Sequence, residues 1–161
     1  MDKHSILTTQ LGSISDWITN ADSKASYVLT FNAALFGFIG WMFSFYTVTS
    51  CLEFIVAGLF LVSFLISTYK AFRVLVPNVK PAAGAGGHWF FGSIAQIGLE
   101  DYKKWVNSAE SDDIVEELSE QIHTTSKIAL NKFNLIRSSL IGLVFAFLFG
   151  VLFFSLLILG S

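Results

Sequence analysis

The sequence predicts an all-α membrane protein: three transmembrane helices, with helices extended into a cytoplasmic helical bundle. The 161-residue chain is 53% hydrophobic and only 14% charged, which is too apolar for a soluble domain of this size. No charge occurs between Lys24 and Glu53, and none follows Arg137, so long stretches can enter hydrocarbon. Apolar residues also recur at three- and four-residue steps, which is the spacing of a helix face.

Residues 5–24 are predicted to form a cytoplasmic amphipathic helix. Its apolar seam follows a heptad pattern at Leu7, Leu11, Ile14, Ile18, Ala21 and Ala25. The seam is short for an autonomous coiled coil, so packing against the helix that starts near Ser111 is favoured over a free-standing zipper. No glycine or proline occurs between Ala25 and Leu35, so this helix is expected to run directly into a first span at 25–45.

A turn at 46–50 and a second span at 51–68 are expected next. A carboxylate costs roughly 2 kcal/mol or more at mid-membrane, so Glu53 is placed at the outer interface. The other end of the span is marked by basic and aromatic residues, which are Tyr69, Lys70, Phe72 and Arg73.

Residues 75–137 are predicted to be a cytoplasmic helical segment. It opens with a Pro- and Gly-containing stretch at 76–87, for which a flexible linker is favoured over an anion-binding nest because the Gly-Lys-Ser/Thr ending of a phosphate loop is missing. An aromatic cluster at 88–91 and a short helix at 99–108 follow. A long helix then opens with Ser111 as its N-cap and two acidic residues in its first turn.

The third span is predicted at 138–160. From Ser138 onward 24 residues carry no ionisable side chain, which is enough to cross about 30 Å at about 1.5 Å per residue. Apolar residues keep helix-face spacing from Ile114 to Leu140. One continuous helix is therefore expected to join the cytoplasmic segment to this span.

The positive charges predict an orientation. All ten Lys and Arg lie before the first span, between the second and third, or on the approach to the third. The positive-inside rule then places the N-terminus and residues 75–137 in the cytoplasm, and the C-terminus outside. The net charge of −2 argues against a nucleic-acid polymer as partner.

No catalytic constellation is evident, so an enzyme is not expected, nor are a metal or a cofactor. The three histidines are scattered, without an HExxH pair or a cysteine partner, and no serine sits in a nucleophile elbow. Glu116, Glu117 and Glu120 are interpreted as a solvated helix face.

A binding site is a stronger expectation than an active site. Asp22 and Lys24 stand where the first helix enters the membrane, and at two residues apart they point in different directions, so each needs its own partner. The candidate partners are Lys70, Arg73, Lys132 and Arg137. The alternative is a structural ion pair for Asp22 and interfacial anchoring for Lys24.

The long helix carries a polar and basic zone that includes Gln121, Lys127 and Lys132. Successive steps of five residues from Lys127 to Arg137 rotate each side chain by about 140°, so the three cations cannot form one stripe. Contact with anionic lipid headgroups, worth ~1 kcal/mol each, is favoured from the residues alone. A small anionic ligand held by one or two of them is the alternative.

Small residues indicate close helix packing. Gly142, Ala146 and Gly150 repeat every four residues, as do Ala33 and Gly37 in the first span. Such faces predict a homo-oligomer or a tight three-helix bundle. Asn32 is expected to bridge helices, and packing is favoured over a pore-lining role.

The order of several short motifs resembles a known family. These are Ala21-Asp22-Ser23-Lys24-Ala25, Phe90-Phe91-Gly92-Ser93-Ile94-Ala95, Glu100-Asp101-Tyr102, Gln121-Ile122-His123, Ser126-Lys127-Ile128-Ala129 and Lys132-Phe133. Their order among three spans, over roughly residues 10–150, resembles the transmembrane effectors of Pycsar, the bacterial anti-phage systems that signal with cyclic pyrimidine nucleotides.

The resemblance implies a sensor and effector in one chain of the bacterial inner membrane, with a periplasmic C-terminus. A partner pyrimidine nucleotide cyclase would make cyclic CMP or cyclic UMP, and the effector would then disrupt the membrane and cause abortive infection. The matched ligand-binding candidates are Asp22, Lys24, Phe90, Phe91, Gly92, Gln121, Lys127 and Lys132. The alternative functions are a constitutive membrane scaffold or subunit that binds a protein partner without a small ligand, and an effector that answers a different cyclic nucleotide.

Overall fold

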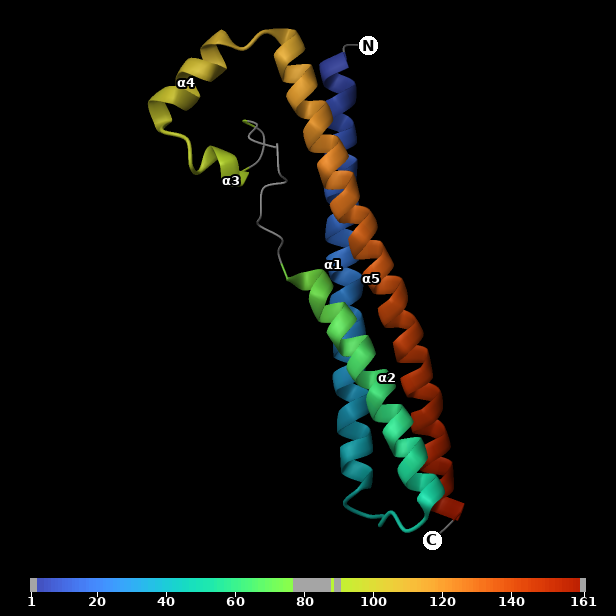
Figure 1. The fold of residues 1–161 in the computed structure, drawn as a ribbon. Coiled ribbons are helices and arrows are strands. Elements are labelled where there is room, and N and C mark those ends of the chain that lie inside the picture. The colour runs from blue at the N-terminus through green and yellow to red at the C-terminus, as the bar shows by residue number, and fades with distance from the viewer. Residues whose placement is uncertain (1–2, 77–87, 89–90, 160–161) are drawn as a thin grey trace. The chain divides into compact units, whose positions relative to one another are not determined.

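The computed structural model describes residues 3–76, 88 and 91–159. This part of the chain forms α-helices and no strand, in the order α1 (Lys3–Met42), α2 (Cys51–Leu75), α3 (Phe91–Ile94), α4 (Leu99–Ser108) and α5 (Ser111–Leu159) (Figure 1). Three of them, α1, α2 and α5, are long and apolar enough to cross a membrane. The predicted fold class, an all-α membrane protein with three transmembrane helices, is confirmed.

The chain divides into two compact units. The first draws on Met1–Asn20 and Pro77–Asn131, and we call it the α4 unit because it holds α3 and α4 beside the N-terminal parts of α1 and α5. The second draws on Ala21–Val76 and Lys132–Ser161, and we call it the three-helix unit because α1, α2 and α5 all contribute to it. Helices α1 and α5 therefore take part in both units.

Helix α1 contains the predicted amphipathic helix and most of the predicted first span. It ends at Met42, three residues before the expected end of the span, and a turn follows. The apolar seam is turned inward, because its residues are buried or half-buried: Leu7, Leu11, Ile14, Ile18, Ala21 and Ala25. In the α4 unit residues of α1 and α5 line one shared groove. The predicted packing of the first helix against the long helix is confirmed.

Helix α2 begins with a capping box that also explains Glu53. The Glu53 amide donates to Ser50 Oγ at 3.2 Å, and its carboxylate accepts from the amides of Thr49 and Ser50 at 2.8 and 3.2 Å. Glu53 is buried, yet its charge faces the free amide end of the helix rather than apolar side chains. The carboxylate therefore accepts hydrogen bonds from backbone amides at the start of α2. This position at the end of an apolar helix agrees with the expected place of Glu53 at the end of a span.

Helix α4 has the predicted bounds. Its exposed side chains form two ion pairs, each between residues three positions apart. Lys103 pairs with Glu100 and Lys104 with Asp101, in each case with the nitrogen 3.1 Å from the carboxylate oxygen. The stretch at 77–87, for which a linker and a nest were both considered, lies outside the described residues. The same holds for Trp89 and Phe90 of the aromatic cluster.

Helix α5 is a single helix of 49 residues, without a break at Arg137. The expected N-cap was off by one residue: Ser111 is already helical, the Ile114 amide bonds to the Glu110 carbonyl at 3.2 Å, and Asp113 accepts from the Glu110 amide at 3.2 Å. Leu140, the last residue of the series with helix-face spacing, is exposed, because Ser139 takes the inward place on that turn.

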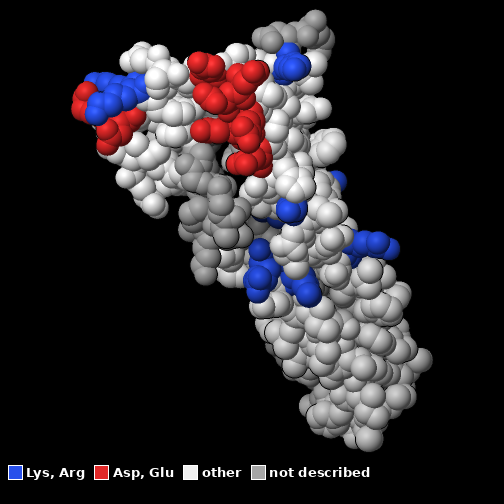
Figure 2. All heavy atoms as spheres, turned by 45° about the horizontal axis from the view of Figure 1, so that its top comes forward, with Lys and Arg blue, Asp and Glu red and all other residues white. Residues whose placement is uncertain are grey.

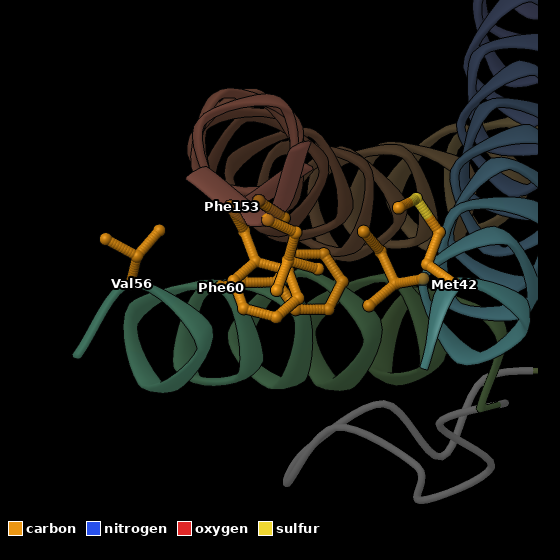
Figure 3. Packing of buried hydrophobic residues seen from close by; sticks show 7 residues of the cluster. Met42, Val56, Phe60 and Phe153 are labelled. Carbon is orange, nitrogen blue, oxygen red and sulfur yellow. The ribbon is translucent and has the colours of Figure 1, made fainter. Parts of the chain in front are cut away.

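The core of the three-helix unit is built from all three long helices. Met42 of α1, Val56 and Phe60 of α2, and Phe153 of α5 converge in one cluster (Figure 3). Large apolar side chains on the outside of the same helices are exposed, among them Phe54, as lipid-facing residues are in a bilayer. Figure 2 shows an extended part of the surface with neither acidic nor basic side chains.

Small residues of α5 make close helix contacts inside this unit. A Cβ added at Gly142 would lie 3.1 Å from the amide nitrogen of Ser67, and one at Gly150 would lie 3.5 Å from the Phe60 ring. Ala146 between them is fully buried. A Cβ at Gly37 of α1 would meet nothing within 4 Å. The tight three-helix bundle is therefore formed within one chain, and the homo-oligomer stays a prediction.

This contact predicts a stability difference between two glycine variants. Gly142→Leu must push α5 away from α2, at a cost of about 1–3 kcal/mol, and so lower the Tm by roughly 2–12 °C. Gly58→Leu is the matched control, because a Cβ at Gly58 meets nothing within 4 Å. Thermal unfolding of both variants in detergent checks this; equal Tm values would contradict the close approach at Gly142.

Candidate functional site

The residues matched as ligand candidates fall into two groups. Gly92, Gln121 and Lys127 belong to the α4 unit, whereas Asp22, Lys24 and Lys132 belong to the three-helix unit. Phe90 lies outside the described residues. Phe91 is the first residue of α3, and its side chain is not described. Within the described residues the structure therefore provides two separate sets of candidates.

Each ligand candidate of the three-helix unit already contacts another side chain of the chain. Lys132 Nζ donates to Asp22 Oδ1 in a part-buried ion pair between α5 and α1. Lys24 lies over the Phe133 ring, 5.6 Å from its centroid, in a cation–π contact. The prediction that Asp22 and Lys24 have different partners is confirmed. Of the four cations considered for Asp22, the partner is Lys132.

The candidates of the α4 unit do not share a helix face. Gln121 is half-buried and Lys127 is exposed. Six residues along one helix place their side chains about 120° apart around its axis. Lys127 makes no ion pair with any described residue, so its charge is available to a phosphate or a headgroup. A joint grip of Gln121 and Lys127 on one small ligand would need groups from another element.

The α4 unit also holds a contact that the sequence did not reveal. The His88 ring stacks on Trp105 with centroids 4.0 Å apart, and His88 Nδ1 lies 3.0 Å from Glu117 Oε1. The His88 amide donates to the other carboxylate oxygen of Glu117 at 2.9 Å. Glu117 thus holds His88 beside Trp105 of α4, which is a structural role rather than the solvated one expected of it.

An acidic hollow of about 420 Å³ lies beside this contact. Its lining residues are His88, Trp105, Ser108, Ala109, Asp113, Glu116, Glu117 and Glu120. Figure 2 shows one large patch of acidic side chains on the visible face, apart from a smaller acidic group that lies beside basic side chains. Four carboxylates disfavour an anionic ligand there. Among the described residues, no three His, Cys, Asp or Glu side chains are placed so that they could hold a metal ion together.

The three-helix unit contains a buried polar cluster amid apolar side chains. Asn32 Nδ2 of α1 donates to Ser67 Oγ at 2.9 Å and Thr68 Oγ1 at 3.2 Å on α2, and Ser139 Oγ of α5 donates to the Ser67 carbonyl at 2.7 Å. The expected bridging role of Asn32 is confirmed. Its carbonyl oxygen has no hydrogen-bond partner among the described residues. This cluster fixes the three helices at one level and leaves one acceptor unsatisfied.

The fold and the contacts define the class of protein: a helical membrane protein with three spans, in which the first and last long helices also build a second, more polar unit. Residues 6–159 match the Pycsar effector protein domain, and the chain therefore belongs to the Pycsar effector family. No curated protein and no solved structure matches the chain. Family membership identifies an anti-phage defence effector of a membrane family rather than a member of a known catalytic family.

The Asp22–Lys132 pair predicts a measurable coupling. Asp22→Asn and Lys132→Met each leave one part-buried charge unpaired, whereas the double variant leaves none. We therefore expect the double variant to be more stable than the sum of the single losses implies, by about 0.5–3 kcal/mol. Unfolding of the four proteins in detergent gives the coupling free energy. A value of zero would show that the two side chains do not interact.

Proposed function

We propose that the chain senses a cyclic pyrimidine mononucleotide, cyclic CMP or cyclic UMP, and then disrupts the bacterial inner membrane, causing abortive infection. The observation that carries this proposal is the match of residues 6–159 to the Pycsar effector domain on a chain with three membrane-length helices. The signal would come from a pyrimidine nucleotide cyclase.

The proposed orientation follows the charges. Basic residues stand at the ends of the apolar stretches that lead toward the α4 unit in sequence, and these are Lys24, Lys70, Arg73, Lys132 and Arg137. Under the positive-inside rule these ends face the cytoplasm, where a cyclase product accumulates. The α4 unit is then the cytoplasmic sensor, and the end of α5 at Leu159 faces the periplasm.

Shared helices offer a route from sensing to the membrane. Because α1 and α5 belong to both units, a ligand that favours one packing of these helices in the α4 unit also biases their packing in the three-helix unit. Binding must discriminate between the two arrangements, since equal affinity for both would shift nothing. Lys127 is the proposed phosphate partner because its charge is exposed and unpaired among the described residues, whereas Lys132 is held by Asp22.

A homo-oligomer is part of the proposal. The small residues Ala33 and Gly37 of α1 are exposed, and nothing approaches a Cβ at Gly37 within 4 Å, so another helix can come close at this face. Assembly in the plane of the membrane would let several chains act on one patch of lipid.

Leakage from vesicles tests the proposal. The full chain in dye-loaded liposomes is expected to release dye when cyclic CMP or cyclic UMP is added, and not with cyclic AMP. At a nucleotide concentration near the Kd of the unaltered chain, Lys127→Met should lose at least about 80% of the release, because removal of a charge-assisted contact of about 1.5–3 kcal/mol weakens binding at least tenfold. Lys103→Met is the matched control, because Lys103 is exposed and already paired with Glu100.

Leakage that ignores the nucleotide, or no leakage at all, would contradict the effector and favour the constitutive scaffold. A response to a different cyclic nucleotide would keep the effector and reject the pyrimidine assignment. Full response of Lys127→Met would remove Lys127 from the site.

A further inference from the structure

A groove of about 500 Å³ runs between α1 and α5 within the α4 unit. Its lining residues are Thr9, Gln10, Ser13, Ile14, Trp17, Ile122 and Ser126. Ile14, which is buried, and Ile122, which is half-buried, supply the aliphatic part of the lining, and the other lining residues supply hydroxyl, amide and indole groups. The volume lies within the range of small-molecule sites, and the lining combines apolar groups with a few polar ones.

Trp17 is the feature that singles this groove out. It is 60% exposed, and it is the only mostly exposed aromatic residue among the described side chains of the α4 unit. Exposed indoles on the membrane-length part of a helix are accounted for by lipid, but Trp17 lies in the polar unit, outside the apolar stretch that follows Lys24. An indole face on a groove wall offers a stacking surface for a flat ring.

The polar groups of the groove suit an uncharged heterocycle. The Gln10 amide has no partner among the described residues and offers both a donor and an acceptor. The hydroxyls of Thr9 and Ser13 donate to backbone carbonyls one turn earlier, so their oxygens remain able to accept. None of the described residues that line the groove carries a charge.

Charge separates this groove from the acidic hollow of the same unit. Four carboxylates line the hollow and repel a phosphate, whereas the groove has none. Lys127 follows the lining residue Ser126 directly on α5, is exposed, and forms no ion pair with described residues. A ring in the groove thus meets an uncharged lining. Lys127 projects about 100° further around α5 than Ser126, so its long side chain meets only an anionic group that extends out of the groove.

We propose that this groove binds the base of the activating nucleotide, with the ring stacked on Trp17, its polar edge bonded to Gln10, and its phosphate near Lys127. The inference rests on the proposed function and assigns the activating nucleotide to the groove between α1 and α5. It assigns the stacking ring to Trp17 rather than to the matched candidates Phe90 and Phe91. It also places the ligand across α1 and α5, the two helices that continue into the three-helix unit.

Calorimetry on the purified full chain in detergent, titrated with cyclic CMP and cyclic UMP, tests this assignment. Trp17→Ala should weaken binding by roughly 5- to 140-fold, which corresponds to the loss of about 1–3 kcal/mol of base–aromatic stacking. Trp17→Phe should keep most of the affinity. Trp41→Ala is the matched control, since Trp41 is an exposed indole at the end of α1 in the three-helix unit.

A second pair of variants protects the test against misfolding. Ser126→Val places a methyl group against the ring edge and should weaken binding severalfold, whereas Ser119→Val, on the exposed side of the same helix, should not. Circular dichroism must show equal helicity for all variants.

The outcomes separate the two proposals. If the unaltered chain binds neither nucleotide, the pyrimidine-sensing function is overturned and the groove assignment with it. If the unaltered chain binds and Trp17→Ala binds equally well, the groove assignment alone is overturned. If Trp17→Ala changes only the oligomeric state seen by light scattering, the groove is an interface between copies and the assignment is likewise overturned.

Discussion

A backbone inside hydrocarbon has to satisfy its own hydrogen bonds, and in this chain that constraint acts most strongly on α5. Any break in the charge-free stretch after Arg137 would expose amide and carbonyl groups to lipid at several kcal/mol each. Continuous helix also fixes which way each side chain points. Lys132 faces Asp22, Ser139 faces Ser67, and Gly142 approaches the same serine. A shift of one residue would rotate each by about 100° and remove these contacts together.

Polar groups in the three-helix unit follow the same logic. The Asn32 amide and the hydroxyls of Ser67, Thr68 and Ser139 bond to one another across three helices, because lipid offers them nothing else. The unsatisfied Asn32 carbonyl means that the packing is not optimal at this level. Under the proposed function the helices rearrange when ligand binds, and a fully satisfied cluster would make that rearrangement harder.

Much of the fold was predictable because it follows from local pattern. Charge-free runs located the three long apolar helices, and the 99–108 helix was placed to the residue. The Ser50-x-x-Glu53 pattern is typical of a capping box, and it could have predicted the start of α2. The place of Glu53 was instead predicted only from the cost of a carboxylate inside the membrane. Contacts between distant segments were not predictable. Spacing shows that Asp22 needs a partner, but only packing selects Lys132 among four cations.

The site was less predictable than the fold for the same reason. Motif order identified the family, but it ranked Gln121 with Lys127 although they lie on different sides of α5. The His88–Glu117 contact joins residues 29 apart in sequence, so no local pattern marks it. Trp17 belonged to no motif, and its place beside α5 emerges only when two helices 100 residues apart share a groove.

The continuity of α5 is the central claim, and a single distance measures it. Ser119 and Ser138 are both exposed, and each can be replaced by cysteine to carry a spin label once Cys51 is replaced by Ser. The two labelled positions are 19 residues apart along α5. At 1.5 Å per residue the backbone separation is about 28 Å. Pulsed electron paramagnetic resonance in liposomes should then give one narrow distribution near that value. A broad distribution, or one centred well below it, would show a joint in α5 and contradict the account.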